Sequence, residues 1–121
     1  MKKHILIVDD EAVIRDLLAE ALTGVGYRVT GVPSAVEAQH TVRVDPPHLV
    51  ISDLQLEASD GLEMIAQLKT TLPNVPVMLL AGVYFDPAVV RDTLGDKIAC
   101  YLQKTSPLAR ILEEVRRLTG S

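Results

Sequence analysis

The chain has 121 residues, with 16 acidic and 12 basic side chains, a net charge of -4 and 48% hydrophobic residues. A chain of this length can bury roughly two-thirds of the surface that it exposes when unfolded, so we expect a single globular domain over residues 1–121. The single cysteine, Cys100, excludes internal disulfides and favours a reducing, cytoplasmic compartment, while the lack of a basic patch and of any apolar run near ~20 residues argues against direct nucleic-acid binding and membrane insertion.

Short β-branched runs alternate along the chain with stretches of helical period. We expect strands at residues 5–8, 27–32, 49–52, 75–80 and 98–102. Their aliphatic density is typical of strands that are covered on both faces. Apolar residues at three- and four-residue steps predict three helices, within 13–25, 62–68 and 108–118.

Two further helices are predicted from their start signals. Ser34 with Glu37 three residues later forms a capping box, and Asp86 followed by Pro87 supplies a cap and a first helical residue. The chain therefore repeats strand and helix five times. This order predicts a parallel sheet with right-handed crossovers and helices on both faces.

Polar side chains follow several of the predicted strands, at the edge of the sheet where ligands bind in such folds. They are Asp9, Asp10 and Glu11 after the first strand, Asp53 after the third and Lys104 after the fifth. Carboxylate oxygens suit Mg²⁺, an aspartate can act as a nucleophile toward phosphorus, and a lysine supplies a point charge for phosphoryl oxygens. The first two acids also suit the positive end of the helix that follows them, and this second interpretation stays open here.

Four segments together carry a resemblance to a known family. They are ILIVDDE at residues 5–11, LVISDL at 49–54 with DGLE at 60–63, VPVMLL at 75–80 and YLQK at 101–104. With this spacing the chain resembles, over essentially its whole length, the receiver domain of bacterial two-component response regulators. The resemblance implies an α/β, flavodoxin-like doubly wound sheet of five parallel strands in the order 2-1-3-4-5, with five helices.

The resemblance also implies a function for the acidic residues. Asp53 would accept a phosphoryl group from a histidine kinase or a histidine phosphotransfer protein. Mg²⁺ would be bound by Asp10, Asp53 and the backbone carbonyl of Gln55, with Asp9 acting through a metal-bound water. Such a domain promotes only its own phosphorylation and dephosphorylation, acts on an output domain or effector protein, and is expected as a monomer or weak dimer.

The remaining site positions include both matches to the family and departures from it. Lys104 and the backbone of Gly82 would contact the phosphoryl group, but the family's Thr or Ser after the fourth strand is Ala81 here, which has no hydroxyl. The family's proline after the lysine is Thr105, before which a cis peptide bond would cost about 2.5 to 4 kcal/mol. Tyr101 stands where the family has an aromatic switch residue, although ordinary packing at a strand end explains a tyrosine equally well.

Two alternatives compete with a phosphoacceptor switch. A pseudo-receiver, which would be an interaction module with little dependence on phosphorylation, is suggested by the missing hydroxyl at Ala81 and the missing proline at Thr105. A magnesium-dependent phosphohydrolase would need an Asp-x-Asp motif after the first strand, which this chain lacks. For the switch itself we expect slow self-dephosphorylation, because Val83 has no polar atom to orient the attacking water and only Gln55 could hold one.

Overall fold

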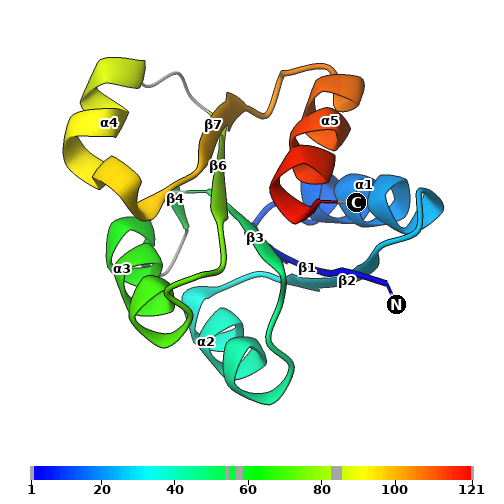
Figure 1. The fold of residues 1–121 in the computed structure, drawn as a ribbon, viewed down its shortest axis with the longest axis horizontal. Coiled ribbons are helices and arrows are strands. Elements are labelled where there is room, and N and C mark those ends of the chain that lie inside the picture. The colour runs from blue at the N-terminus through cyan, green and yellow to red at the C-terminus, as the bar shows by residue number, and fades with distance from the viewer. Residues whose placement is uncertain (1, 54, 57–58, 83–85, 121) are drawn as a thin grey trace.

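The computed structural model describes residues 2–53, 55–56, 59–82 and 86–120 (Figure 1). The long strands are β1 (His4–Val8), β2 (Arg28–Val32), β3 (Leu49–Ser52), β6 (Val77–Ala81) and β7 (Cys100–Gln103). The α helices are α1 (Ala12–Gly24), α2 (Ala35–Val44), α3 (Gly61–Thr71), α4 (Pro87–Leu94) and α5 (Leu108–Thr119). Two short strands, β4 (Gln55–Leu56) and β5 (Ser59–Asp60), pair with each other, and a 3-10 helix covers Gly95–Lys97.

The long strands form one parallel sheet in the order β2-β1-β3-β6-β7. Counted by the five long strands alone, this is the order 2-1-3-4-5, so the predicted flavodoxin-like fold is confirmed. The order reverses between β1 and β3, which lie side by side in the middle of the sheet. The carboxyl ends of these two strands are therefore the place where this architecture holds its ligands.

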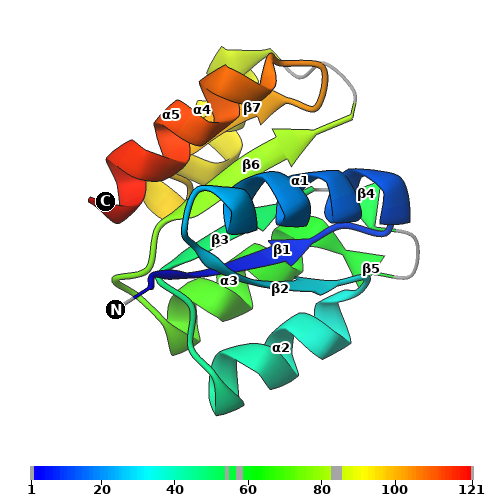
Figure 2. The same ribbon diagram turned by 90° about the vertical axis from the view of Figure 1, so that its right-hand side faces the viewer.

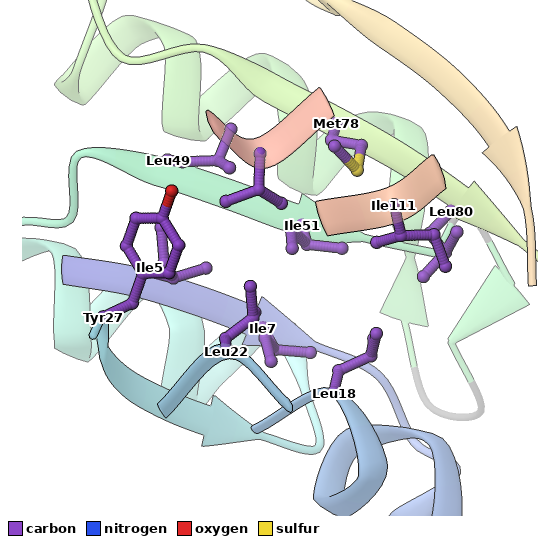
Figure 3. Close-up of a cluster of buried hydrophobic side chains, with 11 residues drawn as sticks. Ile5, Ile7, Leu18, Leu22, Tyr27, Leu49, Ile51, Met78, Leu80 and Ile111 are labelled. Carbon is purple, nitrogen blue, oxygen red and sulfur yellow. The ribbon is translucent and has the colours of Figure 1, made fainter. Parts of the chain in front are cut away.

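Helices cover both faces of the sheet, as the alternation of strands and helices predicts (Figures 1 and 2). Helices α1 and α5 lie on one face, and α2, α3 and α4 lie on the other. Figure 3 shows Ile5 and Ile7 of β1 in one apolar cluster with Leu18, Leu22 and Ile111, beneath α1 and α5. Because successive residues of a strand face opposite sides, the alternate residues of β1 belong to the cluster under α2 and α3. Apolar layers on both faces thus hold the central strands in fixed positions.

Some element boundaries differ from the sequence prediction. Strand β6 begins two residues later than expected, since Pro76 has no N–H for the ladder and contributes only its carbonyl, which accepts from the N–H of Val50 at 3.1 Å. Strand β7 also begins two residues late, because the chain first forms the 3-10 helix and Ile98 then packs against Leu79 and Leu94 beneath α4. At their carboxyl ends, both strands extend one residue further than predicted, to Ala81 and Gln103.

Both predicted helix caps are present in the structure. The Ser34 hydroxyl accepts from the N–H of Glu37 at 3.4 Å, and Asp86 accepts from the N–H of Ala88 at 2.9 Å. The peptide bonds of the described residues are all trans, including the bond between Lys104 and the residue after it. None of the described helices has the length and apolar character needed to cross a lipid bilayer.

Candidate functional site

Three strand ends bring together the polar side chains singled out from the sequence. Asp9 follows β1 and Asp53 follows β3, and these two residues are only 2% and 4% exposed. The N–H of Asp9 donates to the carbonyl of Val32 at 3.1 Å, and the N–H of Asp53 donates to that of Val8 at 3.3 Å. These bonds extend the sheet by one residue beyond the strands. Both carboxylates therefore start from a rigid backbone.

Lys104, which follows β7, joins the acidic residues into one cluster. Its Nζ lies 2.8 Å from Oδ2 of Asp9, 2.9 Å from Oδ2 of Asp53 and 2.6 Å from Oε1 of Glu11. The Lys104 side chain is 6% exposed, whereas that of Glu11 is 58% exposed. Two of the three ion pairs are thus buried, and the third closes the cluster on its solvent side.

The cluster changes the proton affinities of its members. Burial alone would lower the pKa of Lys104, but hydrogen bonds to Asp9, Glu11 and Asp53 outweigh burial and raise this pKa above its ordinary value. Burial raises the pKa of the Asp9 carboxyl, and the charge of Asp53 adds to this effect, while Lys104 and the N–H of Glu11 oppose it. Lys104 is therefore a permanent cation in this site.

The acidic cluster could hold a metal ion. One carboxylate oxygen from each of Asp9, Glu11 and Asp53 lies within 4.8 Å of the others. Three carboxylates against one ammonium group leave a surplus of two negative charges when all are ionised. Because Asp9 and Asp53 are buried, this surplus is unfavourable, and a hard cation that prefers oxygen ligands would offset it.

The two other residues expected at a metal are also close to this edge. Asp10 lies between Asp9 and Glu11 and is partly buried. The backbone of Gln55 lies in β4, two residues beyond Asp53 and opposite Asp60. Helix α1 begins only at Ala12, and its first turn contains no acidic residue, so the acidic turn precedes the helix rather than forming part of it.

The end of β6 completes the site. Ala81 is fully buried, and its carbonyl accepts from the N–H of Lys104 at 2.7 Å. A side chain at Gly82 would begin 3.6 Å from Cδ of Lys104 and 3.8 Å from Oε1 of Glu11, so the backbone of Gly82 borders the acidic cluster directly. Ala81, which has no hydroxyl where the family has Thr or Ser, is therefore in direct backbone contact with Lys104.

Tyr101 lies in β7, beneath α4 and farther from the carboxyl end of the sheet than Lys104. It packs against Leu79, Val90 and Leu94 and helps to line a hollow of about 360 Å³ between α4 and β7. Lys104 is three residues later on the same segment, so one strand end links the acidic cluster to this packing. The expectation placed on Val83 concerns a position outside the described residues, and so does Leu54, the last residue of the LVISDL segment.

Sequence reasoning did not assign a role to Glu11 or Arg15. Glu11 is at the N-cap of α1, but its side chain makes no capping hydrogen bond and contacts Lys104 instead. Arg15 donates from Nη1 to the backbone carbonyl of Asp9 at 2.6 Å. A third acid after the first strand was a signal for Glu11, whereas nothing in the sequence singles out Arg15.

Comparisons with known proteins agree with this geometry. The model of the response regulator receiver domain matches residues 5–116. The response regulator MprA of Mycobacterium ulcerans (strain Agy99) is 30% identical over 125 residues, which is 98% of this chain and 50% of that protein. The chain thus spans about half the length of the curated relatives that it matches.

Solved structures give the same result. The receiver domain of NtrX from Brucella abortus is 27% identical, with a TM-score of 0.87 over 97% of this chain and 98% of that one. The receiver domain of DrrB in its BeF3-activated form is 25% identical, with a TM-score of 0.87 over the whole of both chains. The family model covers the whole five-stranded sheet except its first residue, together with the helices on both faces of the sheet. This chain therefore belongs to the response regulator receiver domain family, the signalling modules of two-component systems.

Proposed function

We propose that this chain is a phosphoacceptor switch in which Asp53 receives a phosphoryl group from a histidine kinase or a histidine phosphotransfer protein. The observation that carries the proposal is the buried bridge from Asp53 through Nζ of Lys104 to Asp9, at 2.9 and 2.8 Å. Asp53 follows the central strand of the sheet and is only 4% exposed. A buried carboxylate beside a fixed cation is better suited to accept a phosphoryl group covalently than to serve as an ordinary hydrated surface charge.

The proposed transfer is a substitution at phosphorus. A carboxylate oxygen of Asp53 forms a bond to phosphorus, the phosphorus–nitrogen bond of the donor phosphohistidine breaks, and the electron pair returns to the imidazole. Mg²⁺, when bound by Asp10, Asp53 and the Gln55 carbonyl, supplies positive charge that offsets the repulsion between carboxylate and phosphoryl group. Lys104 already lies beside Asp53 and supplies a second positive charge for the phosphoryl oxygens.

The signal would leave the site through β7. A phosphoryl group adds about -1.5 to -2 charges and three strong acceptors, so it competes with Asp9 and Glu11 for the ammonium group of Lys104. A shift of Lys104 acts on the strand that carries Tyr101 and hence on the packing beneath α4. We propose that the face formed by β6, α4, β7 and α5 contacts an output domain or an effector protein. We also propose that residues 1–121 form one receiver domain.

Phosphorylation by a small donor tests the proposal. Phosphoramidate carries a phosphorus–nitrogen bond like that of phosphohistidine, and the mass of the intact protein reports the added group. We expect one phosphoryl group on the wild type in Mg²⁺, and none on Asp53→Asn or after EDTA treatment. The exposed Asp92→Asn variant is the matched control and should react like the wild type. Equal phosphorylation of Asp53→Asn would overturn the assignment of the acceptor.

A further inference from the structure

The side chain of Arg15 lies across the end of β2 and reaches the acidic turn. Its Nη1 donates to the backbone carbonyl of Asp9 at 2.6 Å, and its own N–H donates to the carbonyl of Glu11 at 3.0 Å. Within the turn, the N–H of Glu11 donates to Oδ1 of Asp9 at 2.9 Å. The residue after the first helical turn is thus bonded to both ends of the segment that carries Asp9, Asp10 and Glu11.

The path of this side chain depends on Gly31 in β2. A Cβ atom at Gly31 would lie 2.8 Å from Cγ and 3.1 Å from Cδ of Arg15, closer than side-chain atoms pack. The positive φ values among the described glycines belong to Gly26, Gly95 and Gly120, so the backbone at Gly31 does not itself require glycine.

Space for the arginine is the remaining reason for a glycine at this position. Glycine weakens the interior of a strand and often marks a close approach of other atoms. The nearest atom to a Cβ at Gly31 would be Cγ of Arg15, which moves away only if the side chain changes its χ1 rotamer, whereas the far end of the side chain has several rotatable bonds. An added methyl group would therefore displace the whole arginine stem.

We propose that Arg15 is a positioning residue for the acidic turn and that Gly31 provides the space in which it acts. The inference rests on the proposed function, because its purpose is to hold the carboxylates of Asp9, Asp10 and Glu11 toward the strand ends. The guanidinium group also brings a positive charge to the backbone of a turn with three acidic side chains. Hydrogen-bond partners of this kind orient metal-binding groups, and their loss commonly weakens metal binding by about tenfold or more.

The first test is Mg²⁺ binding, followed by amide NMR during a titration with MgCl2. Arg15→Met keeps most of the stem but loses the donor, and we expect its affinity for Mg²⁺ to fall about tenfold. Arg15→Lys keeps a positive donor and should recover part of the loss. Gly31→Ala should weaken Mg²⁺ binding in the wild-type background and have no further effect on it in Arg15→Met, because the guanidinium donor that the added methyl group displaces is already absent there. Gly24→Ala, where a Cβ would meet no atom within 4 Å, is the matched control.

The second test is made without metal. The N–H of Glu11 is bonded to Asp9, and its hydrogen exchange reports how firmly the turn is held. We expect faster exchange of this amide in Arg15→Met and in Gly31→Ala, with unchanged exchange in the centre of β3. Exchange at the wild-type rate in Arg15→Met would overturn the proposal whether or not metal binds.

The outcomes separate this inference from the proposed function. If the wild type bound Mg²⁺ and Arg15→Met bound it equally well, the positioning role would be wrong while the phosphoacceptor role could stand. If the effects of Gly31→Ala and Arg15→Met added in the double variant, Gly31 would act by another route and the proposed link would be wrong. If the wild type failed to bind Mg²⁺, the proposed function would fail, and the exchange rate of Glu11 would still decide the role of Arg15.

Discussion

Replacing Lys104 by methionine should destabilise the domain strongly in the absence of divalent cations. The ammonium group lies within 3.0 Å of carboxylate oxygens of Asp9, Glu11 and Asp53, and methionine removes the charge while filling similar volume. Two buried carboxylates, at 2% and 4% exposure, then repel each other without a counterion.

The magnitude follows from the burial of these pairs. Removing one partner of a buried ion pair costs about 3 to 5 kcal/mol, because an uncompensated charge remains inside the protein. The contact to Glu11 adds little, since that carboxylate is 58% exposed and screened by water. The two buried contacts do not simply add, because the variant also avoids the cost of burying the ammonium group. We therefore expect a loss of about 3 to 5 kcal/mol, which is a large part of the ~5 to 15 kcal/mol stability of a typical domain.

Urea unfolding followed by circular dichroism, in EDTA and in saturating Mg²⁺, measures this effect. The loss in Lys104→Met should be large in EDTA and smaller in Mg²⁺, because a cation bound to the folded state replaces the missing charge. Adding Asp53→Asn to Lys104→Met should recover stability, since it removes one of the unpaired carboxylates, and this double variant remains measurable if the single variant does not fold. An unfolding midpoint for Lys104→Met equal to that of the wild type in EDTA would refute the reasoning, as would further destabilisation of the double variant.

Three other predictions concern separate parts of the molecule. Ala81→Thr should enlarge the change in the NMR signals of Tyr101 on saturation with beryllofluoride. A new hydroxyl hydrogen bond that is about 1.4 kcal/mol stronger in the active state than in the inactive state changes the ratio of these two states about tenfold. An identical response of the wild type and the variant would contradict this prediction. Burial lowers the pKa of His4 below 6.5, so the unfolded chain binds a proton more readily than the folded domain and the free energy of unfolding falls as the pH falls through 6.5. His4→Leu cannot bind this proton and should therefore lose less stability than the wild type when the pH is lowered through 6.5. An equal dependence of the free energy of unfolding on pH in both proteins would count against this prediction. Asp86→Ala removes the acceptor for the N–H of Ala88 and should lower the free energy of unfolding by about 1 kcal/mol, as measured by urea unfolding, with no change expected in Mg²⁺ affinity.

The fold was predictable because its signals are local and repeated. The apolar run of β1 and the three- and four-residue spacing in α1 each identify an element without knowledge of its neighbours. The paired strands β4 and β5 were not predicted, since a strand of two residues is too short to show a period. The 3-10 helix at Gly95–Lys97 is also too short to show a period, and because it was not predicted, β7 begins two residues later than expected.

The grouping of side chains in the candidate site was predictable in part. Asp53 and Lys104 could be found because each directly follows a strong strand pattern, and parallel strands bring their carboxyl ends to one edge. Contacts made by long side chains could not be found in this way. Arg15 reaches Asp9 only because β2 places Gly31 beneath its stem, and that coincidence depends on how a helix and a strand pack.

The distribution of the site along the chain has a consequence for synthesis on the ribosome. Asp9 and Lys104 are 95 positions apart, so both buried acids emerge long before their common counterion. Until β7 has been translated, a sheet of the first strands would hold two buried carboxylates together without an ammonium group between them. Nascent chains that end before this lysine lack the counterion of the native arrangement, so the acidic cluster is complete only when nearly the whole domain has been made.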